Sequence, residues 1–269
     1  RLQLDKIIST LNELPLSTLT TDRQQAEVAW MERGWGVKVT ESYAHRAGQE
    51  NIFGSPLIQS IYYDTPDFLL TRRSISRPNY KEKLRLRTYG HPGDDAPAYA
   101  EIKKKVNGIV YKRRVRMSAE GARQYTLGLA YEQAQALYPV KSGAESDLAP
   151  GKIQIAREID AFFRRYDDLA PSMLISCLRE AWCPIVPDDA DCVDRITFDE
   201  DICYVDLMEE AVQRRRVAGE GQVVMEIKCA GGYPVWLSKL LTETGAFPRS
   251  FSKYGNAYKR TLAARGDVE

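Results

Sequence analysis

The sequence is poor in the residues and patterns that build zinc sites, disulfide frameworks and membrane spans. It has two histidines and five cysteines, and no two of the cysteines form a CxxC pair, so it lacks zinc-type spacing. We therefore expect reduced thiols and a cytoplasmic protein. No apolar run approaches the ~18 residues of a membrane span, and no signal peptide is visible. Because the chain begins with Arg, we expect a fragment, and its upstream parts leave membrane association open.

Net charge is also nearly absent, at +1 over 269 residues. A hydrophobic content of 43% and a charged content of 28% are typical of a globular protein with a real core. Any basic cluster is therefore local, which argues against a general nucleic-acid binder. The length fits one large domain or two small ones, and we expect a single domain over residues 1–269.

What the sequence does have is a cationic stretch from Tyr80 to Arg116. Period-two alternation, broken by a Gly/Pro/Asp segment at 91–97 and by the turn signal Asn107-Gly108, predicts three neighbouring antiparallel strands. One face then carries Lys83, Arg85, Arg87, Lys103, Lys105, Lys112, Arg114 and Arg116, with Glu101 as its single carboxylate.

Two interpretations of this face stay open. Antiparallel sheets commonly expose one side to water, so it could be a solvated surface. Solvated faces usually mix both charge signs, however, because like charges opposite one another are destabilising. A nearly pure cationic face favours a bound polyanion. RNA is disfavoured as that polyanion, because stacking aromatic residues do not interleave with the cations.

The remaining pattern predicts an α+β protein. We expect strands at 57–63, 173–182, 195–199 and 223–229, besides the three basic ones. We expect helices at 1–14, from Ser118 to about 138, at 153–166, from Pro234 to 244, and near the C-terminus. The charged segment 203–221 is interpreted as a loop. Many short strands with helices at the periphery favour a closed antiparallel β-barrel, which can surround one ligand with cationic strands.

A set of motifs in one order resembles a known family. The motifs are S-I-Y-Y-D-T-P-D (60–67), K-L-R-L-R-T-Y-G (83–90), A-E-I-K-K-K-V-N-G-I-V-Y-K-R-R-V (100–115), L-R-E-A-W (178–182), R-I-T-F-D (195–199), V-M-E-I-K (224–228) and F-S-K-Y-G (251–255). Together they resemble the polyphosphate polymerase domain of the vacuolar transporter chaperone (VTC) proteins, within the triphosphate tunnel metalloenzymes of the CYTH-like group. The resemblance implies a closed barrel whose interior is a basic tunnel.

Roles for individual residues follow from the resemblance. It implies that the catalytic cations are Arg85, Arg87, Lys103, Lys112, Arg179, Arg195 and Lys228. It further implies that Ser252 and Lys253 bind substrate, and Arg114 is expected to join them from its strand face. Glu226 would hold Mn²⁺ or Mg²⁺, with help from Glu101.

The activity implied by the resemblance is a metal-dependent ATP:polyphosphate phosphotransferase. It would transfer the γ-phosphate of ATP to a growing inorganic polyphosphate chain, and pyrophosphate and phosphate would be further ligands. Two alternatives stay open: a hydrolase of tripolyphosphate or nucleoside triphosphates, and a non-catalytic polyphosphate-binding domain. The presence of Glu226 favours catalysis over binding alone.

The sequence departs from the family pattern in two places. Family members begin with a tunnel strand of the form E-x-K or D-R-K-Y before a helix like residues 1–14, and no such motif occurs here. We expect that strand to lie upstream of this fragment. Cys177 stands where the family usually has Tyr.

Overall fold

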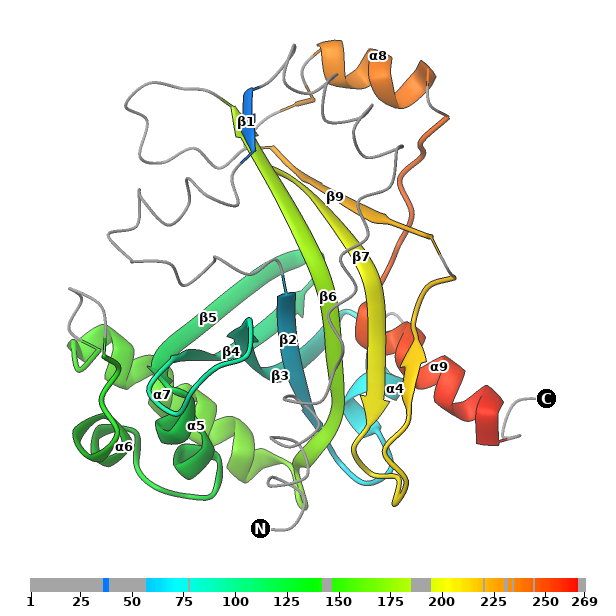
Figure 1. The fold of residues 1–269 in the computed structure, drawn as a ribbon. Helices are drawn as coiled ribbons and strands as arrows, with labels where there is room; N and C mark the ends of the chain where they lie inside the picture. The colour runs from blue at the N-terminus through cyan, green and yellow to red at the C-terminus, as the bar shows by residue number, and fades with distance from the viewer. Residues whose placement is uncertain are drawn as a thin grey trace.

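The computed structural model describes residues 36–38, 57–76, 78–141, 147–184, 195–219, 221–229, 232–233, 235–243 and 245–265. Its elements are β1 (Gly36–Lys38), β2 (Leu57–Asp64), α4 (Leu69–Ile75), β3 (Tyr80–Tyr89), β4 (Pro97–Val106), β5 (Ile109–Ser118), α5 (Ala119–Thr126), α6 (Tyr131–Leu137), α7 (Pro150–Arg165), β6 (Ala170–Pro184), β7 (Arg195–Asp206), β8 (Arg214–Arg216), β9 (Val224–Lys228), α8 (Val235–Glu243) and α9 (Lys253–Arg265) (Figure 1). The helix predicted at 1–14 lies outside the described residues.

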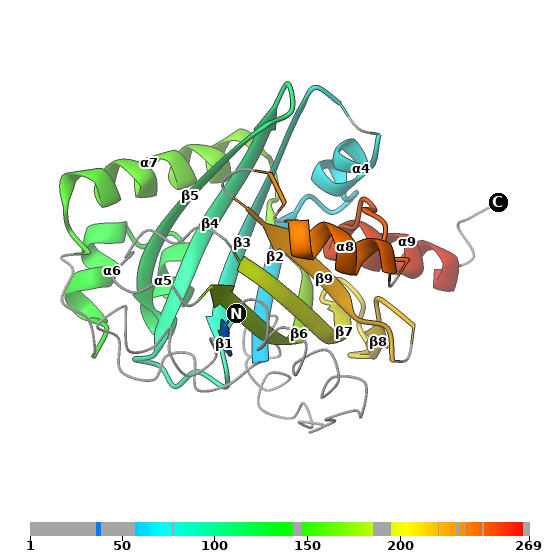
Figure 2. The same cartoon turned by 90° about the horizontal axis from the view of Figure 1, so that it is seen from above.

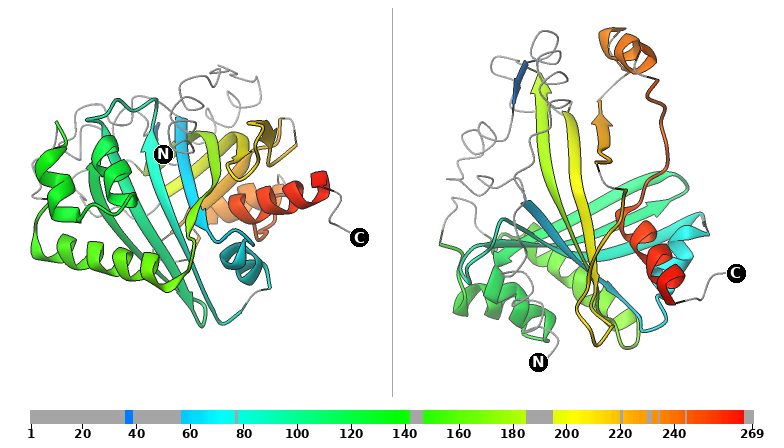
Figure 3. Two further views of the ribbon diagram at one scale, coloured as in Figure 1. Left: turned by 90° about the horizontal axis from the view of Figure 1, so that it is seen from below. Right: turned by 45° about the vertical axis from the view of Figure 1, so that its right-hand side comes forward.

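The strands form one antiparallel sheet. Its order is β5-β4-β3-β2-β6-β7-β8, while β1 pairs with β6 and β9 pairs with β7. The sheet is strongly twisted, so that β6 and β7 run across the direction of β3, β4 and β5 (Figures 1 and 3). The α+β class expected from the sequence is therefore confirmed, with the helices placed around the sheet.

The three basic strands are antiparallel neighbours, as the alternation predicts. Asn107 and Gly108 have φ of 47° and 89°, and this left-handed turn is the conformation that Asn-Gly adopts readily. It joins β4 to β5 in a register that sets Val106 opposite Ile109. The turn chemistry and the alternation thus fix the same pairing.

The prediction of a closed barrel is wrong, because the sheet is open. Within the described residues β5 pairs only with β4, and at the other end β8 and β9 pair only with β7. Closure needs a strand that bonds to the free edge of β5 and to the far end of the sheet, and no described segment does so. The first half of β5, from Ile109 to Arg114, is correspondingly exposed. Period-two alternation reports the faces of a strand but not whether its sheet closes.

One face of the sheet, here called the helical face, is covered by α5, α6 and α7 (Figure 2). Leu84, Ile102 and Val115 on β3, β4 and β5 pack there against Ile159 and Phe162 of α7. These are the apolar positions that alternate with the cations, so burial of this face directs Arg85 and its neighbours to the opposite face.

The opposite face, here called the inner face, carries a second core. Tyr62, Met173 and Ile175 of β2 and β6 pack there against Tyr254 and Ala257 of α9. This core covers only part of the inner face. The cationic side chains occupy the rest of that face, next to Lys253, the first residue of α9.

Two local predictions are corrected. The helix expected from Ser118 to 138 is divided into α5 and α6, because Gly128 takes a φ of 106° between them. Ser118 does cap α5, accepting a bond from Gly121 N. The expected loop 203–221 instead contains the end of β7 and the whole of β8. β8 pairs with β7, and Asp201 offsets its charge by contacting Arg214 and Arg216.

None of the helices in the described ranges is both long and apolar enough to cross a membrane.

Candidate functional site

The cations of β3, β4 and β5 are aligned across the strands. Lys83 lies opposite Lys103, which lies opposite Lys112. The next row sets Arg85 opposite Glu101, which lies opposite Arg114. Like charges directly opposite one another destabilise a sheet. The row of three lysines therefore favours an anion that neutralises it.

Glu101 is the centre of the first group of side chains, here called the Glu101 cluster. Its side chain is 1% exposed, and its two oxygens contact Arg85 at 2.6 Å and Lys112 at 2.9 Å. Arg85 also donates to the hydroxyl of Tyr62 at 3.2 Å. Burial alone would raise the pKa of the Glu101 carboxyl, but the charges of Arg85, Arg87 and Lys112 outweigh it and lower the pKa to about 2. Glu101 is therefore ionised at neutral pH.

Arg87 is the cation of this cluster with the weakest protein contact. Its Nε lies 3.9 Å from the nearest Glu101 oxygen and is buried without a hydrogen-bond partner among the described residues. Buried donors are nearly always paired, so an unpaired charged one marks a place for an acceptor. The acceptor that suits a guanidinium is a carboxylate or a phosphate oxygen.

A second group, here called the Asp199 cluster, lies on β6, β7 and α9. Asp199 accepts from Arg179 Nε at 2.6 Å and from Arg179 Nη2 at 2.7 Å, and its second oxygen also contacts Lys253 Nζ. Burial would raise the pKa of this carboxyl, but its bonds to Arg179 and the charge of Lys253 lower it. The pair Arg179 and Lys253 is thus held on one buried carboxylate.

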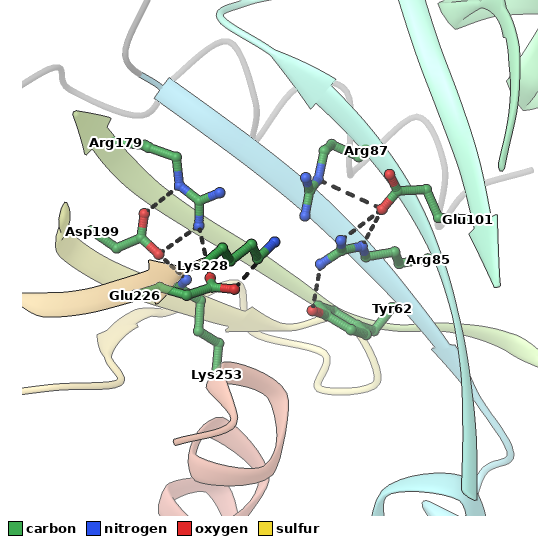
Figure 4. Close-up of polar contacts among 9 residues, drawn as sticks. All are labelled: Tyr62, Arg85, Arg87, Glu101, Arg179, Asp199, Glu226, Lys228 and Lys253. Atoms are coloured by element: carbon green, nitrogen blue, oxygen red, sulfur yellow. Dashed lines mark hydrogen bonds and ion pairs between the residues drawn. The ribbon is translucent and has the colours of Figure 1, made fainter. Parts of the chain in front are cut away.

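Glu226 and Lys228 extend this second group from β9. Glu226 is 47% exposed and lies 3.3 Å from Lys228 Nζ and 3.9 Å from Arg179 Nη2. Burial works to raise its pKa, but the charges of Lys228 and Arg179 lower it overall. Figure 4 shows the side chain of Lys228 extending from the Asp199 cluster towards Arg85. In this view the Glu101 cluster and the Asp199 cluster border one site.

The N-terminal end of α9 completes the border. Lys83 of β3 donates to Ser252 Oγ at 3.0 Å, so this helix touches the strand of the Glu101 cluster as well as Asp199. Tyr254, the second residue of α9, is buried and stacks on Tyr62 with ring centroids 4.6 Å apart. Its hydroxyl donates to Asp64 at 2.7 Å. These contacts fix the position of Lys253.

Most residues named from the sequence meet at this site. The side chains gathered on its border are those of Arg85, Arg87, Lys112, Glu101, Arg179, Lys228, Glu226, Ser252 and Lys253. Lys103 and Arg114 share their strand face but are exposed, and Arg114 lies over the ring of Tyr99 at 5.1 Å. Arg195 is paired in register with Lys228, and its side chain lies outside the described residues. The roles assigned to these residues stay predictions.

Three participants were not assigned a role from the sequence: Tyr62, Lys83 and Asp199. Alternation along the strand places Asp199 on the same face as Thr197. The sequence therefore predicts the orientation of Asp199, but it does not predict which cations Asp199 contacts. Tyr62 meets Arg85 only through the pairing of β2 with β3. Lys83 was on the predicted cationic face, and its contact with Ser252 depends on how α9 docks.

The two carboxylates expected to hold a metal differ in how well they suit one. Both oxygens of Glu101 are engaged by cations, so it fits a metal poorly. Glu226 is half-exposed and loosely paired, and Mg²⁺ is commonly held by one or two carboxylates together with substrate phosphates. No group of three or more His, Cys, Asp or Glu side chains gathers within the described ranges. Glu226 therefore fits a metal that substrate helps to bind.

Comparison with protein families identifies the chain. The model of the VTC domain matches residues 16–262. The chain belongs to the VTC domain family. This match covers nearly the whole chain and includes both clusters, so the resemblance inferred from the motifs is confirmed. No curated protein matches the chain.

Proposed function

We propose that this VTC domain is a polyphosphate polymerase that transfers the γ-phosphate of ATP to a growing inorganic polyphosphate chain. The observation that carries the proposal is the convergence of cations from β3, β5, β6, β9 and α9 on one site, where Lys83 of β3 contacts Ser252 beside Lys253 (Figure 4). These cations outnumber the carboxylates between them, as a site for a linear polyanion requires. Membership of the VTC domain family supports the same substrate class.

Phosphoryl transfer asks little covalent chemistry of a protein. The γ-phosphoryl group passes from the oxygen that bridges the β- and γ-phosphates of ATP to the terminal oxygen of polyphosphate, and ADP leaves with the former bridging oxygen. The protein must align donor and acceptor and stabilise negative charge. Arg85, Arg87 and Arg179 can each grip non-bridging oxygens with a planar fork. Lys228 and Lys253 act as more mobile point charges. Because these groups are fixed before substrate arrives, they need little reorganisation during transfer.

A divalent metal is part of the proposal. Glu226 would hold it, and the metal would supply positive charge to phosphate oxygens that it shares with the protein. Glu101 would not be a ligand, because its oxygens already bind cations.

The test is the change Glu226→Gln, which preserves shape and removes the charge that a metal requires. With ATP and Mn²⁺, wild-type protein is expected to give products that form a ladder of chain lengths on a gel. We expect the variant to lose at least about 100-fold in rate, while tripolyphosphate affinity without metal stays similar or increases. The matched control is Glu120→Gln on α5, where Glu120 pairs with Arg123 on the helical side of the molecule; it should keep the wild-type rate.

Other products would point to other functions. Release of phosphate without a ladder would identify a hydrolase. Tripolyphosphate binding without turnover would identify a binding domain. A Glu226→Gln protein with a near wild-type rate would remove the metal role and leave Glu226 as the partner of Lys228.

A further inference from the structure

Asp199 joins two cations that come from distant parts of the chain. Arg179 is 20 residues away on β6, and Lys253 is 54 residues away at the start of α9. Asp199 itself is fully buried on β7, directly opposite Arg179 in the strand register. One carboxylate therefore determines where an arginine of the sheet and a lysine of a helix stand relative to each other.

The contacts of Asp199 use only part of each cation. Arg179 donates hydrogen bonds from Nε and Nη2 to Asp199. Its Nη1 contacts none of the other residues shown in Figure 4 and is directed towards the Arg87 side of the site. The Lys253 ammonium has three protons, and one bond to Asp199 leaves others available. Both cations are thus oriented by a buried anion on one side and can meet a phosphate on the other.

A simpler explanation is that Asp199 only balances the positive charge of the site. This explanation and a positioning role predict different effects on anion binding. If Asp199 only offsets positive charge, then neutralising it would strengthen anion binding on the order of tenfold or more, since a repulsive charge at close range is removed. If it positions Arg179 and Lys253, the gain in charge is opposed by the cost of ordering two long side chains when substrate binds. Affinity then changes little, while the rate falls because the transition state requires correct geometry.

We propose that Asp199 is a positioning residue for phosphoryl transfer, acting through Arg179 and Lys253. The inference rests on the proposed function, because it concerns the geometry of that reaction. Asp199 touches neither phosphate nor metal in this account. Its effect is to hold a guanidinium and an ammonium as one preformed anion-binding pair across the boundary between sheet and helix.

The test compares Asp199→Asn with Asp201→Asn in the full chain. Asp201 lies on the same strand and also binds two cations, Arg214 and Arg216, but these belong to β8 outside the site. Asn readily takes the positive φ of 43° found at residue 201. We expect Asp199→Asn to lower kcat with ATP and Mn²⁺ by about 10–100-fold, with the Kd for tripolyphosphate within about threefold of wild type. Asp201→Asn should leave both unchanged.

A second readout does not depend on turnover. Acetylation of Lys253 by an amine-reactive ester, followed by mass spectrometry, measures how free its ammonium is. We expect labelling of Lys253 to rise several-fold in Asp199→Asn and to stay at the wild-type level in Asp201→Asn. Lys112, which contacts Glu101 in the other cluster, is the internal standard and should be labelled equally in all three proteins.

The outcomes separate the inference from the proposed function. An unchanged kcat, unchanged Lys253 labelling, or tripolyphosphate binding tightened more than tenfold in Asp199→Asn would each overturn the positioning role. If wild-type protein binds tripolyphosphate but forms no polymer, the proposed function is wrong. Labelling and affinity then still decide whether Asp199 organises the two cations.

Discussion

Glu101 and Asp199 are both buried carboxylates on the inner face, and they differ in the number and origin of the cations that they contact. Glu101 is shared by Arg85, Arg87 and Lys112, all within one run of consecutive strands. Asp199 is shared by Arg179 and Lys253, from a strand and a distant helix. The Glu101 cluster therefore has the larger cationic excess, and the Asp199 cluster depends more on how the chain packs.

This difference suggests a division of work between the two regions. Excess positive charge attracts a polyanion over several ångströms, so the Glu101 cluster should contribute more to affinity. A paired arginine and lysine with fixed orientation should contribute more to the geometry of transfer. Changes to residues of the two clusters test this comparison, and the largest effect is expected at Glu101.

Glu101→Gln should be the most destabilising change in the two clusters. Removing one partner of a buried ion pair leaves its cations uncompensated, at a cost of about 3–5 kcal/mol. Three cations depend on Glu101 and two on Asp199, so Asp199→Asn should cost less. Urea unfolding at neutral pH measures both, with Glu120→Gln as a partly exposed control expected to change stability by less than about 1 kcal/mol. A larger loss in Asp199→Asn would reverse the comparison.

The carboxylate of Glu101 should make the stability of the protein depend on pH in the acidic range. The pKa of Glu101 falls from an ordinary value of 4.5 to about 2 in the folded protein. A group with a depressed folded pKa stabilises the protein fully above its unfolded pKa and loses this contribution as pH falls through the folded pKa. We expect the Glu101 contribution, about 3 kcal/mol, to disappear between about pH 4.5 and pH 2.

Thermal unfolding of wild type and Glu101→Gln across this pH range measures the contribution. The two stability curves should converge as the pH decreases, because protonated glutamate and glutamine are both neutral. Parallel curves would show that Glu101 is not held ionised by its neighbours.

Arg87→Ala should weaken tripolyphosphate binding more than Arg179→Ala. Arg87 lacks a hydrogen-bond partner at Nε, whereas Arg179 already has a bidentate partner in Asp199. A charged hydrogen bond contributes about 1.5–3 kcal/mol, so we expect about 10–100-fold weaker binding for Arg87→Ala and less than about tenfold for Arg179→Ala. Isothermal titration in metal-free buffer gives both constants. Equal losses would contradict the proposed division between clusters.

Tyr254→Phe should have the smallest effect on stability, and the change should be confined to the place where α9 packs against the sheet. The hydroxyl of Tyr254 donates to Asp64 and lies 2.8 Å from Ser172 Oγ, and its loss should cost about 1–2 kcal/mol. Tyr258→Phe on the same helix is the control, since that hydroxyl makes no hydrogen bond among the described residues, and it should be nearly neutral. Thermal unfolding compares the two variants, and equal stability would show that Tyr254 is held by its ring alone.

The basic strands and their faces could be predicted from the sequence because the necessary information is local. Alternation of Leu84 with Arg85 fixes which residues share a face, and Asn107-Gly108 fixes the turn and hence the register of β4 with β5. Motif order carried the family assignment, which the VTC domain match confirms. Local patterns were less reliable for β8. Its run of arginines was predicted to lie in a loop, but in the structure it forms a strand that pairs with β7.

Only the tertiary structure decided how the strands meet and which side chains become partners. Closure of the sheet depends on a bond between its end strands, and alternation within one strand carries no information about its distant neighbours. The assignment of Glu101 to three cations and of Asp199 to Arg179 and Lys253 likewise depends on pairing and on the docking of α9. The sequence by itself determined the cationic face, because side-chain direction follows from backbone period. The grouping of that charge into two clusters around buried carboxylates was decided by packing, because ion pairs form between residues that only the fold brings together.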